Sequence, residues 1–235
     1  MSQSRSLHHV AFIVDGNRRW AKQRGLSVVA GHNLAANETI EQIVYHCLER
    51  NIPYVTFWAF STENWKRGSA FTNLLFGILK KTLEKNVDNY FRAGIRLNTI
   101  GDLCKLPPEL ASRISELCDE SKHLNNLTVT IALNYGGRDE IVRAIKRMVD
   151  EKKLTCETIN DITPDLISQY LDTSDLPDVD LIVRTGGEQR MSGFMPWQSI
   201  YAEYAFTDTL FPDLTLKEVD QIFDDFESRH RRFGS

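Results

Sequence analysis

A single carboxylate followed by several cations is the first feature of the sequence that could do chemistry. Asp15 comes directly after the apolar run AFIV, and Gly16, Asn17, Arg18 and Arg19 follow it. A hard cation such as Mg²⁺ takes one or two carboxylates and fills its other positions with water and phosphate oxygens, and arginine adds charge-assisted hydrogen bonds to phosphate. The segment therefore predicts a metal-assisted phosphate site. Taken alone, it is explained more simply by Asp15 as a helix N-cap beside solvated arginines.

A second segment of the same kind lies nearer the C-terminus. The loop TGGEQRMS, residues 185–192, places Arg184, Arg190 and Ser192 around two glycines, which let a backbone approach a ligand closely. Gly-Gly loops with arginines are common, so this loop is weak evidence by itself. Two such loops at one edge of a fold indicate a site for two polyanionic groups.

Alternating strands and helices must bring these loops together. Apolar runs predict strands at 9–14, 54–60, 95–100, 127–133 and 179–184, with a candidate sixth at 201–206. Helical periodicity predicts helices at 33–50, 71–91, after Pro107-Pro108, 139–149 and 216–233. Such alternation predicts an α/β domain, a mostly parallel sheet with helices on both faces. Ligands bind at the carboxyl ends of the strands in these folds, where both loops would lie.

Composition narrows the class of protein. The chain has 235 residues and a net charge of −4, which suits one domain spanning 1–235 and argues against a nucleic-acid binder. Its four cysteines show no CxxC spacing, so neither a zinc site nor a disulfide framework is expected. No apolar run approaches the ~20 residues that span a bilayer, so we expect a cytoplasmic protein that could still touch a membrane surface. The Walker, dinucleotide, nucleophile-elbow and DDxxD patterns are all missing.

Six segments together resemble a known family. They are HVAFIVDGNRRWAKQRG, AGH, FWAFSTENWKR, LNYGGRDEI, DLIVRTGGEQRMSGFMPWQSIYAEYAF and RRFG, in that order along nearly the whole chain. The chain resembles the cis-prenyltransferases, or Z-type isoprenyl diphosphate synthases, which include bacterial undecaprenyl diphosphate synthase. The resemblance implies a six-stranded parallel sheet flanked by helices, an apolar tunnel, Mg²⁺ as cofactor and a homodimer.

The resemblance also implies a reaction. Enzymes of this kind add isopentenyl diphosphate units to an allylic prenyl diphosphate, here expected to be farnesyl diphosphate, and make each new double bond cis. The expected product is a long polyprenyl diphosphate such as undecaprenyl diphosphate, a lipid carrier precursor for cell-wall synthesis, through which the enzyme could contact membranes. The alternatives are a short-chain or irregular, head-to-middle synthase of the same fold, and a non-catalytic subunit, which would be expected to lack Asp15.

Site roles follow from the matched motifs, residue by residue. Asp15 matches the metal-linked aspartate, and Glu203 matches a carboxylate near the metal that could reach across a dimer. The catalytic residues would be Asp15, Asn17 and Ser61. The allylic diphosphate would be bound by Gly16, Asn17, Arg18, Arg19, Trp20, His32 and Arg67. Isopentenyl diphosphate would be bound by Arg184, Arg190 and Ser192. A mobile loop would comprise Ser61, Thr62, Glu63, Asn64 and Trp65. Arg232 and Gly234 fit a C-terminal Arg-x-Gly pattern that in some relatives completes the partner subunit's site. The proton acceptor is left open, between a diphosphate oxygen and a group near Asn17 and Ser61.

Two positions depart from the family pattern. Val28 stands where many relatives have a phosphate-binding arginine, and Gln189 where many have histidine. Arg18 and Arg24 are extra cations that could compensate for Val28, or the preferred allylic donor could differ.

The helix at 71–91 is the predicted tunnel wall, although ordinary core packing explains its pattern as well. The expected wall residues are Leu74, Leu75, Ile78, Leu79 and Val87. The small Ala59 and Gly77 favour a long product, whereas the bulky Trp58, Phe71 and Phe76 argue for a short one.

Overall fold

The computed structural model describes residues 6–229 and contains one sheet of six strands. The strands are β1 (His9–Ile13), β2 (Tyr54–Ser61), β3 (Ile95–Ile100), β4 (Leu127–Tyr135), β5 (Leu181–Arg184) and β6 (Glu203–Phe206). Their order across the sheet is β3-β4-β2-β1-β5-β6, and every neighbouring pair is parallel. All six strand predictions are confirmed, and the sheet is entirely rather than mostly parallel. The predicted Arg232 and Gly234 lie outside the described residues.

The helices follow the predicted alternation with additions. They are α1 (Asn17–Gln23), α2 (Val28–Leu34), α3 (Ile40–Glu49), α4 (Ser69–Arg92), α5 (Pro108–Glu120), α6 (Gly137–Asp150), α7 (Pro164–Tyr170) and α8 (Leu216–Ser228). Short helical segments are η1 (Ala35–Thr39), η2 (Thr62–Arg67), η3 (Leu103–Lys105), η4 (Ile159–Asp161) and η5 (Phe211–Asp213). None of the helices within residues 6–229 is long and apolar enough to cross a membrane.

The helix predicted for 33–50 begins earlier, so its predicted start is wrong. The segments α2, η1 and α3 follow one another without a break, and η1 is π-helical. Gly31 interrupts the apolar pattern in α2 because α1 packs tightly against it. A Cβ atom on Gly31 would lie 2.1 Å from the Asn17 carbonyl oxygen, so this helix tolerates the conformational cost of glycine in return for close packing.

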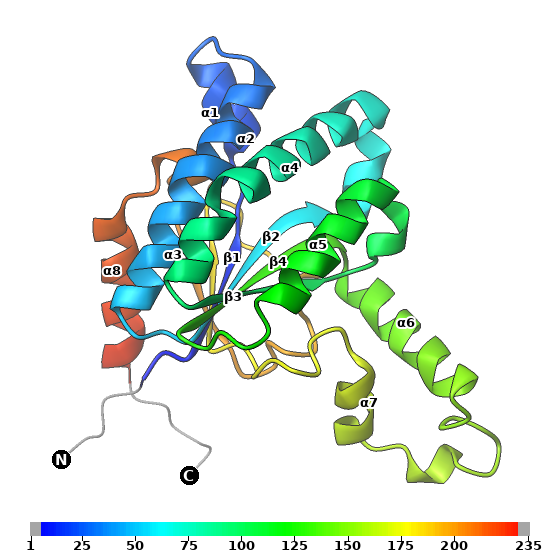
Figure 1. Ribbon diagram of the computed structural model, residues 1–235. Coiled ribbons are helices and arrows are strands. Elements are labelled where there is room, and N and C mark those ends of the chain that lie inside the picture. The colour runs from blue at the N-terminus through cyan, green and yellow to red at the C-terminus, as the bar shows by residue number, and fades with distance from the viewer. Residues whose placement is uncertain (1–5, 230–235) are drawn as a thin grey trace.

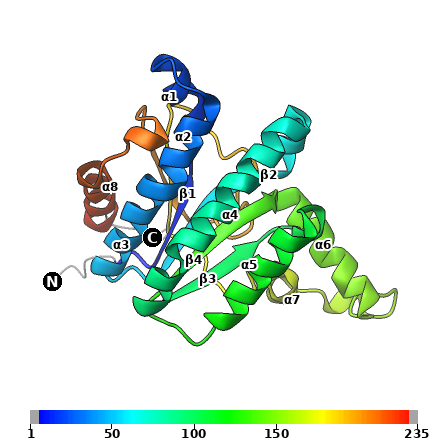
Figure 2. The ribbon, with the colours of Figure 1, turned by 45° about the horizontal axis from the view of Figure 1, so that its top comes forward.

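The two faces of the sheet are covered differently. Figures 1 and 2 show α3, α4 and α5 over one face, with α8 beside α3 and the α6–α7 arm extending away. The main hydrophobic core lies under these helices and includes Phe12, Phe57 and Phe223. On the other face the core contains Phe194 and Met195, which belong to no helix or strand. The predicted helix-flanked sheet is confirmed, and α6 meets this second face through Glu140, which accepts hydrogen bonds from Tyr135 and Gln198.

Candidate active site

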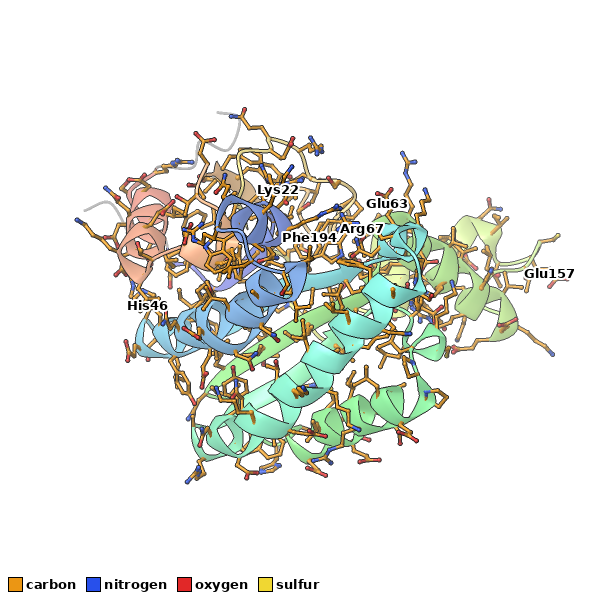
Figure 3. All side chains as sticks on the ribbon, turned by 90° about the horizontal axis from the view of Figure 1, so that it is seen from above. Lys22, His46, Glu63, Arg67, Glu157 and Phe194 are labelled. Carbon is orange, nitrogen blue, oxygen red and sulfur yellow. The ribbon has the colours of Figure 1, made fainter. Side chains whose placement is uncertain are left out.

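The carboxyl ends of β1, β2 and β5 open into one polar cavity of about 680 Å³. Most of the predicted site residues line it: Asp15, Gly16, Asn17, Arg18, Arg19, His32, Ser61, Glu63, Asn64, Arg67, Arg184, Arg190 and Ser192. Figure 3 looks down on this end of the molecule, with Glu63 and Arg67 on η2, just before α4. The prediction that the two arginine-bearing loops converge is confirmed.

Asp15 lies between two guanidinium groups. One carboxylate oxygen accepts a hydrogen bond from Arg184 Nη2 at 3.1 Å, and the other accepts from Arg19 Nη2 at 3.4 Å. The Thr185 hydroxyl donates to the Asp15 carbonyl oxygen at 2.7 Å and fixes the backbone. The simpler explanation of Asp15 as an N-cap is wrong, because Gly16 is the N-cap of α1 and no side chain caps that helix. The Asp15 side chain is one-third exposed and faces the cavity.

Gly16 and Asn17 shape the floor beneath Asp15. Gly16 has a φ of 106°, and a Cβ atom there would lie 2.9 Å from Leu210, so this turn requires glycine. The Asn17 side-chain amide donates to the Val14 carbonyl oxygen at 2.9 Å, while its Oδ1 atom is buried without a partner. Asn17 thus presents an unsatisfied acceptor beside the cavity.

The buried Arg184 side chain holds the loop of residues 185–192 in place. It is only 5% exposed, and its Nη1 atom donates to the Ser192 hydroxyl at 2.9 Å and to the Arg190 carbonyl oxygen. The Arg190 side chain is 61% exposed and pairs with Glu188. Arg184 therefore positions the loop, and Arg190 is the cation that can reach an incoming anion.

The predicted mobile loop forms an ordered turn, η2. Ser61 caps it through a reciprocal capping box with Asn64, whose Oδ1 atom accepts from the Ser61 amide at 2.9 Å. The Trp65 indole donates to Asn134 Oδ1 at 2.7 Å and packs against Phe60. Thr62 and Trp65 do not line the cavity: Thr62 lies against Gly136, and Trp65 packs on the core beside Phe76. The mobility of this segment stays a prediction.

His32 and Arg67 meet at Phe71. The His32 ring lies edge-on to Phe71, and the Arg67 guanidinium lies 5.3 Å from the centre of the same ring. Burial lowers the pKa of His32, a hydrogen bond with the Val28 carbonyl oxygen opposes this, and the nearby Arg67 charge lowers it further. The lowered pKa favours the neutral form of the His32 imidazole, so the charge at this point of the cavity wall is carried by Arg67.

Two predicted residues lie elsewhere. The Trp20 indole is buried and donates to Asp213 Oδ1 at 2.6 Å, outside the cavity. Glu203 begins β6 opposite Leu181, three residues before the cavity end of that strand, and pairs with Arg229 at 3.1 Å. At 3.3 Å per residue, Glu203 starts about 10 Å short of the strand end. Within one chain the register of β6 thus places Glu203 away from Asp15, and a role for Glu203 at the metal, reached across a dimer, stays a prediction.

Of the two cations that could replace the phosphate-binding arginine missing at Val28, only Arg18 is placed to do so. Arg24 donates twice to the Asp213 carboxylate at 3.0 Å and stacks on Trp20, so it is held away from the cavity. Arg18 lines the cavity. Thr185 and Lys66 also belong to the site region but were not singled out in the sequence. The only sequence signal for them was their neighbours: Thr185 directly follows Arg184, and Lys66 directly precedes Arg67.

An apolar tunnel continues inward from the polar cavity. It has about 130 Å³ of internal space, and Asn17, His32 and Leu75 line both chambers. Of the predicted wall, Leu75, Ile78, Leu79 and Val87 line it, with Ala59 opposite, whereas Leu74 does not. Gly77 faces open space and adds no room to the tunnel. Phe76 lines the tunnel, while Trp58 and Phe71 line the polar cavity.

Known proteins share this arrangement. A family model described as "Putative undecaprenyl diphosphate synthase" matches residues 13–234. The isoprenyl transferase of Wolinella succinogenes is 42% identical over 234 residues, covering 100% of this chain and 99% of that protein. That of Treponema denticola is 40% identical over 232 residues, covering 99% of each.

Two solved structures are similar throughout. Lavandulyl diphosphate synthase from Lavandula x intermedia, in complex with dimethylallyl diphosphate, superposes with a TM-score of 0.90 at 33% identity, covering 97% of this chain and 98% of that one. A probable undecaprenyl diphosphate synthase from Campylobacter jejuni has a TM-score of 0.81 at 35% identity, covering 98% and 100%.

Proposed function

The chain belongs to the cis-prenyltransferase family of isoprenyl transferases related to undecaprenyl diphosphate synthase, and from that premise we propose that it elongates an allylic diphosphate with isopentenyl diphosphate. The observation that carries this proposal is the continuity of a polar, arginine-lined cavity with an apolar tunnel through Asn17 and His32. A prenyl diphosphate has the same two parts, a dianionic or trianionic head and a hydrocarbon tail.

The reaction separates charge at the head. The C1–O bond of the allylic diphosphate breaks, the double bond of isopentenyl diphosphate forms a bond to C1, and a proton leaves C2 of the added unit. Arg19 lies where it would stabilise the departing diphosphate, and fixed cations of this kind lower the barrier because they need no reorganisation. Arg190 and Ser192 would hold the second diphosphate, so that the two carbons stand side by side. The proton acceptor is either a diphosphate oxygen or a group near Asn17 and Ser61.

Asp15 fits a magnesium site in which the protein supplies one carboxylate and the substrate supplies phosphate oxygens. Within residues 6–229 no three His, Cys, Asp or Glu side chains gather as a metal centre, but Mg²⁺ commonly takes one carboxylate and completes its shell with phosphate oxygens and water. Asp15 offers such a carboxylate at the cavity wall, and diphosphate oxygens would draw the more exposed Arg19 away from it. When bound, Mg²⁺ would neutralise charge on the leaving diphosphate.

We also propose that the protein acts as a homodimer. Several large apolar side chains are exposed on and before the edge strand β6, namely Ile200, Tyr201, Tyr204 and Phe206, and others on α6, namely Val142, Ile145 and Val149. Exposed apolar side chains gathered in this way mark contact surfaces. Glu203 lies in the same strand, so a partner docked at this edge would lie next to it. Light scattering of the purified protein tests this, and a monomer at micromolar concentration would contradict it.

We propose farnesyl diphosphate as donor and a long cis-polyprenyl diphosphate as product, a membrane-lipid carrier precursor for the cell wall. A short-chain or irregular synthase is the second candidate, favoured by the small internal space of the tunnel and the similarity to lavandulyl diphosphate synthase. Labelled isopentenyl diphosphate with Mg²⁺ and C5, C10 or C15 allylic diphosphates, with products sized by chromatography, separates the two. A single C10 product would overturn the long-chain proposal, and omission of Mg²⁺ in the presence of a chelator should abolish turnover.

A further inference from the structure

A short segment after β6 is hydrogen-bonded to the glycine turn of the loop 185–192. Gly186 donates its amide to the Thr209 carbonyl oxygen, and Gly187 donates its amide to the Thr207 carbonyl oxygen, each at 2.8 Å. Both glycines have a positive φ, of 83° and 80°. Glycine adopts positive and negative φ about equally well, so these two hydrogen bonds decide the shape of the turn. We call residues 207–209 the strap.

One carboxylate holds the strap in place. Glu218 Oε1 accepts from the Thr207 hydroxyl at 2.6 Å, and Glu218 Oε2 accepts from the Thr209 hydroxyl at 3.0 Å. The Thr207 hydroxyl also accepts from the Thr209 amide at 3.1 Å. Hydrogen bonds to a charged acceptor are stronger than those between neutral groups. The two carbonyl groups that support the glycine turn therefore belong to residues that a single side chain fixes.

Glu218 projects from a firmly anchored helix. It is the third residue of α8, and its amide donates to the hydroxyl of Thr215, the N-cap. In a capping box the side chain at this position turns back to the N-cap amide, whereas the Glu218 carboxylate is shared by two hydroxyls outside the helix. Val219 and Phe223 are almost fully buried and anchor α8 in the main core. This geometry indicates that the carboxylate serves the strap and not the helix end.

We propose that Glu218 is a positioning residue for the isopentenyl diphosphate subsite. This inference rests on the proposed function. Glu218 does not line the polar cavity, so it acts through other residues: it fixes the strap, and the strap fixes the glycine turn. The turn in turn sets where Arg190 and Ser192 stand. Arg184 still holds the far part of the loop, so loss of Glu218 should weaken the subsite without abolishing it.

The allylic subsite should respond less to the loss of Glu218. Its loop meets the chain just beyond the strap, where the Phe211 amide donates to the Asp15 carbonyl oxygen at 3.0 Å. The Thr185 hydroxyl donates to the same oxygen independently. Neither donor is hydrogen-bonded to Glu218, so the effect should fall on one substrate more than on the other.

Steady-state kinetics with each substrate varied in turn test the proposal. Glu218→Ala should raise the KM for isopentenyl diphosphate about tenfold, the factor expected for one hydrogen bond to a charged group. It should change kcat and the KM for the allylic diphosphate less than threefold. Glu218→Gln should stay within threefold of wild type, because its amide oxygen can accept from one threonine hydroxyl and its amide nitrogen can donate to the other.

Asp220→Ala is the matched control on the same helix. It also removes two hydrogen bonds of α8, to His46 and Arg50, but none to the strap. It should lower the melting temperature about as much as Glu218→Ala and leave both KM values within threefold. If Glu218→Ala does not fold, Thr209→Val removes one hydroxyl at similar shape and should raise the KM for isopentenyl diphosphate at least threefold. An unchanged KM in the folded variant, or an equal rise in Asp220→Ala, would overturn the proposal.

Amide exchange tests the same link without turnover. In Glu218→Ala, hydrogen–deuterium exchange of the segment 184–190, measured by mass spectrometry, should be about tenfold faster than in wild type, because the Gly186 and Gly187 amides lose fixed acceptors. Asp220→Ala should not change it. Unchanged exchange in Glu218→Ala would refute the link. If the protein elongates no allylic diphosphate but shows the faster exchange, the proposed function fails and the positioning of this loop by Glu218 stands.

Discussion

Replacing Arg184 with lysine isolates the geometric role of its guanidinium from its charge. The Arg184 side chain is almost fully buried and reaches three groups at once: the Asp15 carboxylate and, on the far loop, the Ser192 hydroxyl and the Arg190 carbonyl oxygen. An ammonium group keeps the charge but is a compact point that lacks the planar fork. In Arg184→Lys it can replace the contact to Asp15 or the contacts to the loop, but not both.

The size of the expected effect follows from the hydrogen bonds that lysine cannot form. Two hydrogen bonds from a charged donor disappear, each worth about 1.5 kcal/mol at the low end for such bonds, so the positioning of the loop is weakened by about 3 kcal/mol. If that weakening appears in the transition state, kcat/KM falls about 100-fold, since each 1.36 kcal/mol is a factor of ten. Because the loop carries Arg190 and Ser192, the KM for isopentenyl diphosphate should rise more than the KM for the allylic donor.

Steady-state assays with each substrate varied in turn measure this effect. Arg24→Lys is the matched control, since Arg24 pairs with Asp213 outside the cavity, and it should retain kcat/KM within about threefold because exposed ion pairs contribute little. Circular dichroism melts establish that Arg184→Lys is folded. A folded Arg184→Lys enzyme that keeps more than a third of wild-type kcat/KM would refute the reasoning.

Four further predictions concern the active-site cavity and the buried His9. Asp15→Ala should abolish turnover with an unchanged circular dichroism spectrum, and a near-normal rate would mean that its metal role is misassigned. Arg190→Ala should raise mainly the KM for isopentenyl diphosphate, and a rise for the allylic donor instead would mean that the two subsites are exchanged. Gly16→Ala should lower the urea unfolding free energy by about 1–3 kcal/mol because of its positive φ and the clash with Leu210. Burial lowers the pKa of His9 from 6.5 to about 4, so the unfolded chain takes up the proton first as pH falls. About 3 kcal/mol of stability should be lost between pH 6.5 and 4, and a pH-independent difference between wild type and His9→Gln would contradict this.

The sequence was sufficient for the strands and for the cavity. Buried parallel strands are continuous apolar runs, so the inner strands could be recognised, whereas the half-exposed edge strand β6 was only a candidate. Parallel strands necessarily share one carboxyl edge. Asp15 and Arg184 end neighbouring strands, so their meeting followed from topology. Helix α7 was missed even though Thr163 caps it and Pro164 occupies its first turn, because it is short and has no apolar periodicity.

What the sequence could not supply were contacts between distant segments. Arg24 and Asp213 are 189 residues apart, and only the fold shows that this pair removes Arg24 from the cavity. The register of β6 against β5, which places Glu203 opposite Leu181, is a pairing between separate segments that local sequence patterns do not determine.

Release of diphosphate by the purified protein tests the central claim most directly. With Mg²⁺, isopentenyl diphosphate and farnesyl diphosphate, we predict one diphosphate released for each isopentenyl unit that enters an organic-extractable product, with cis double bonds by nuclear magnetic resonance. No diphosphate release with any C5, C10 or C15 allylic donor would contradict the account and would favour a non-catalytic subunit.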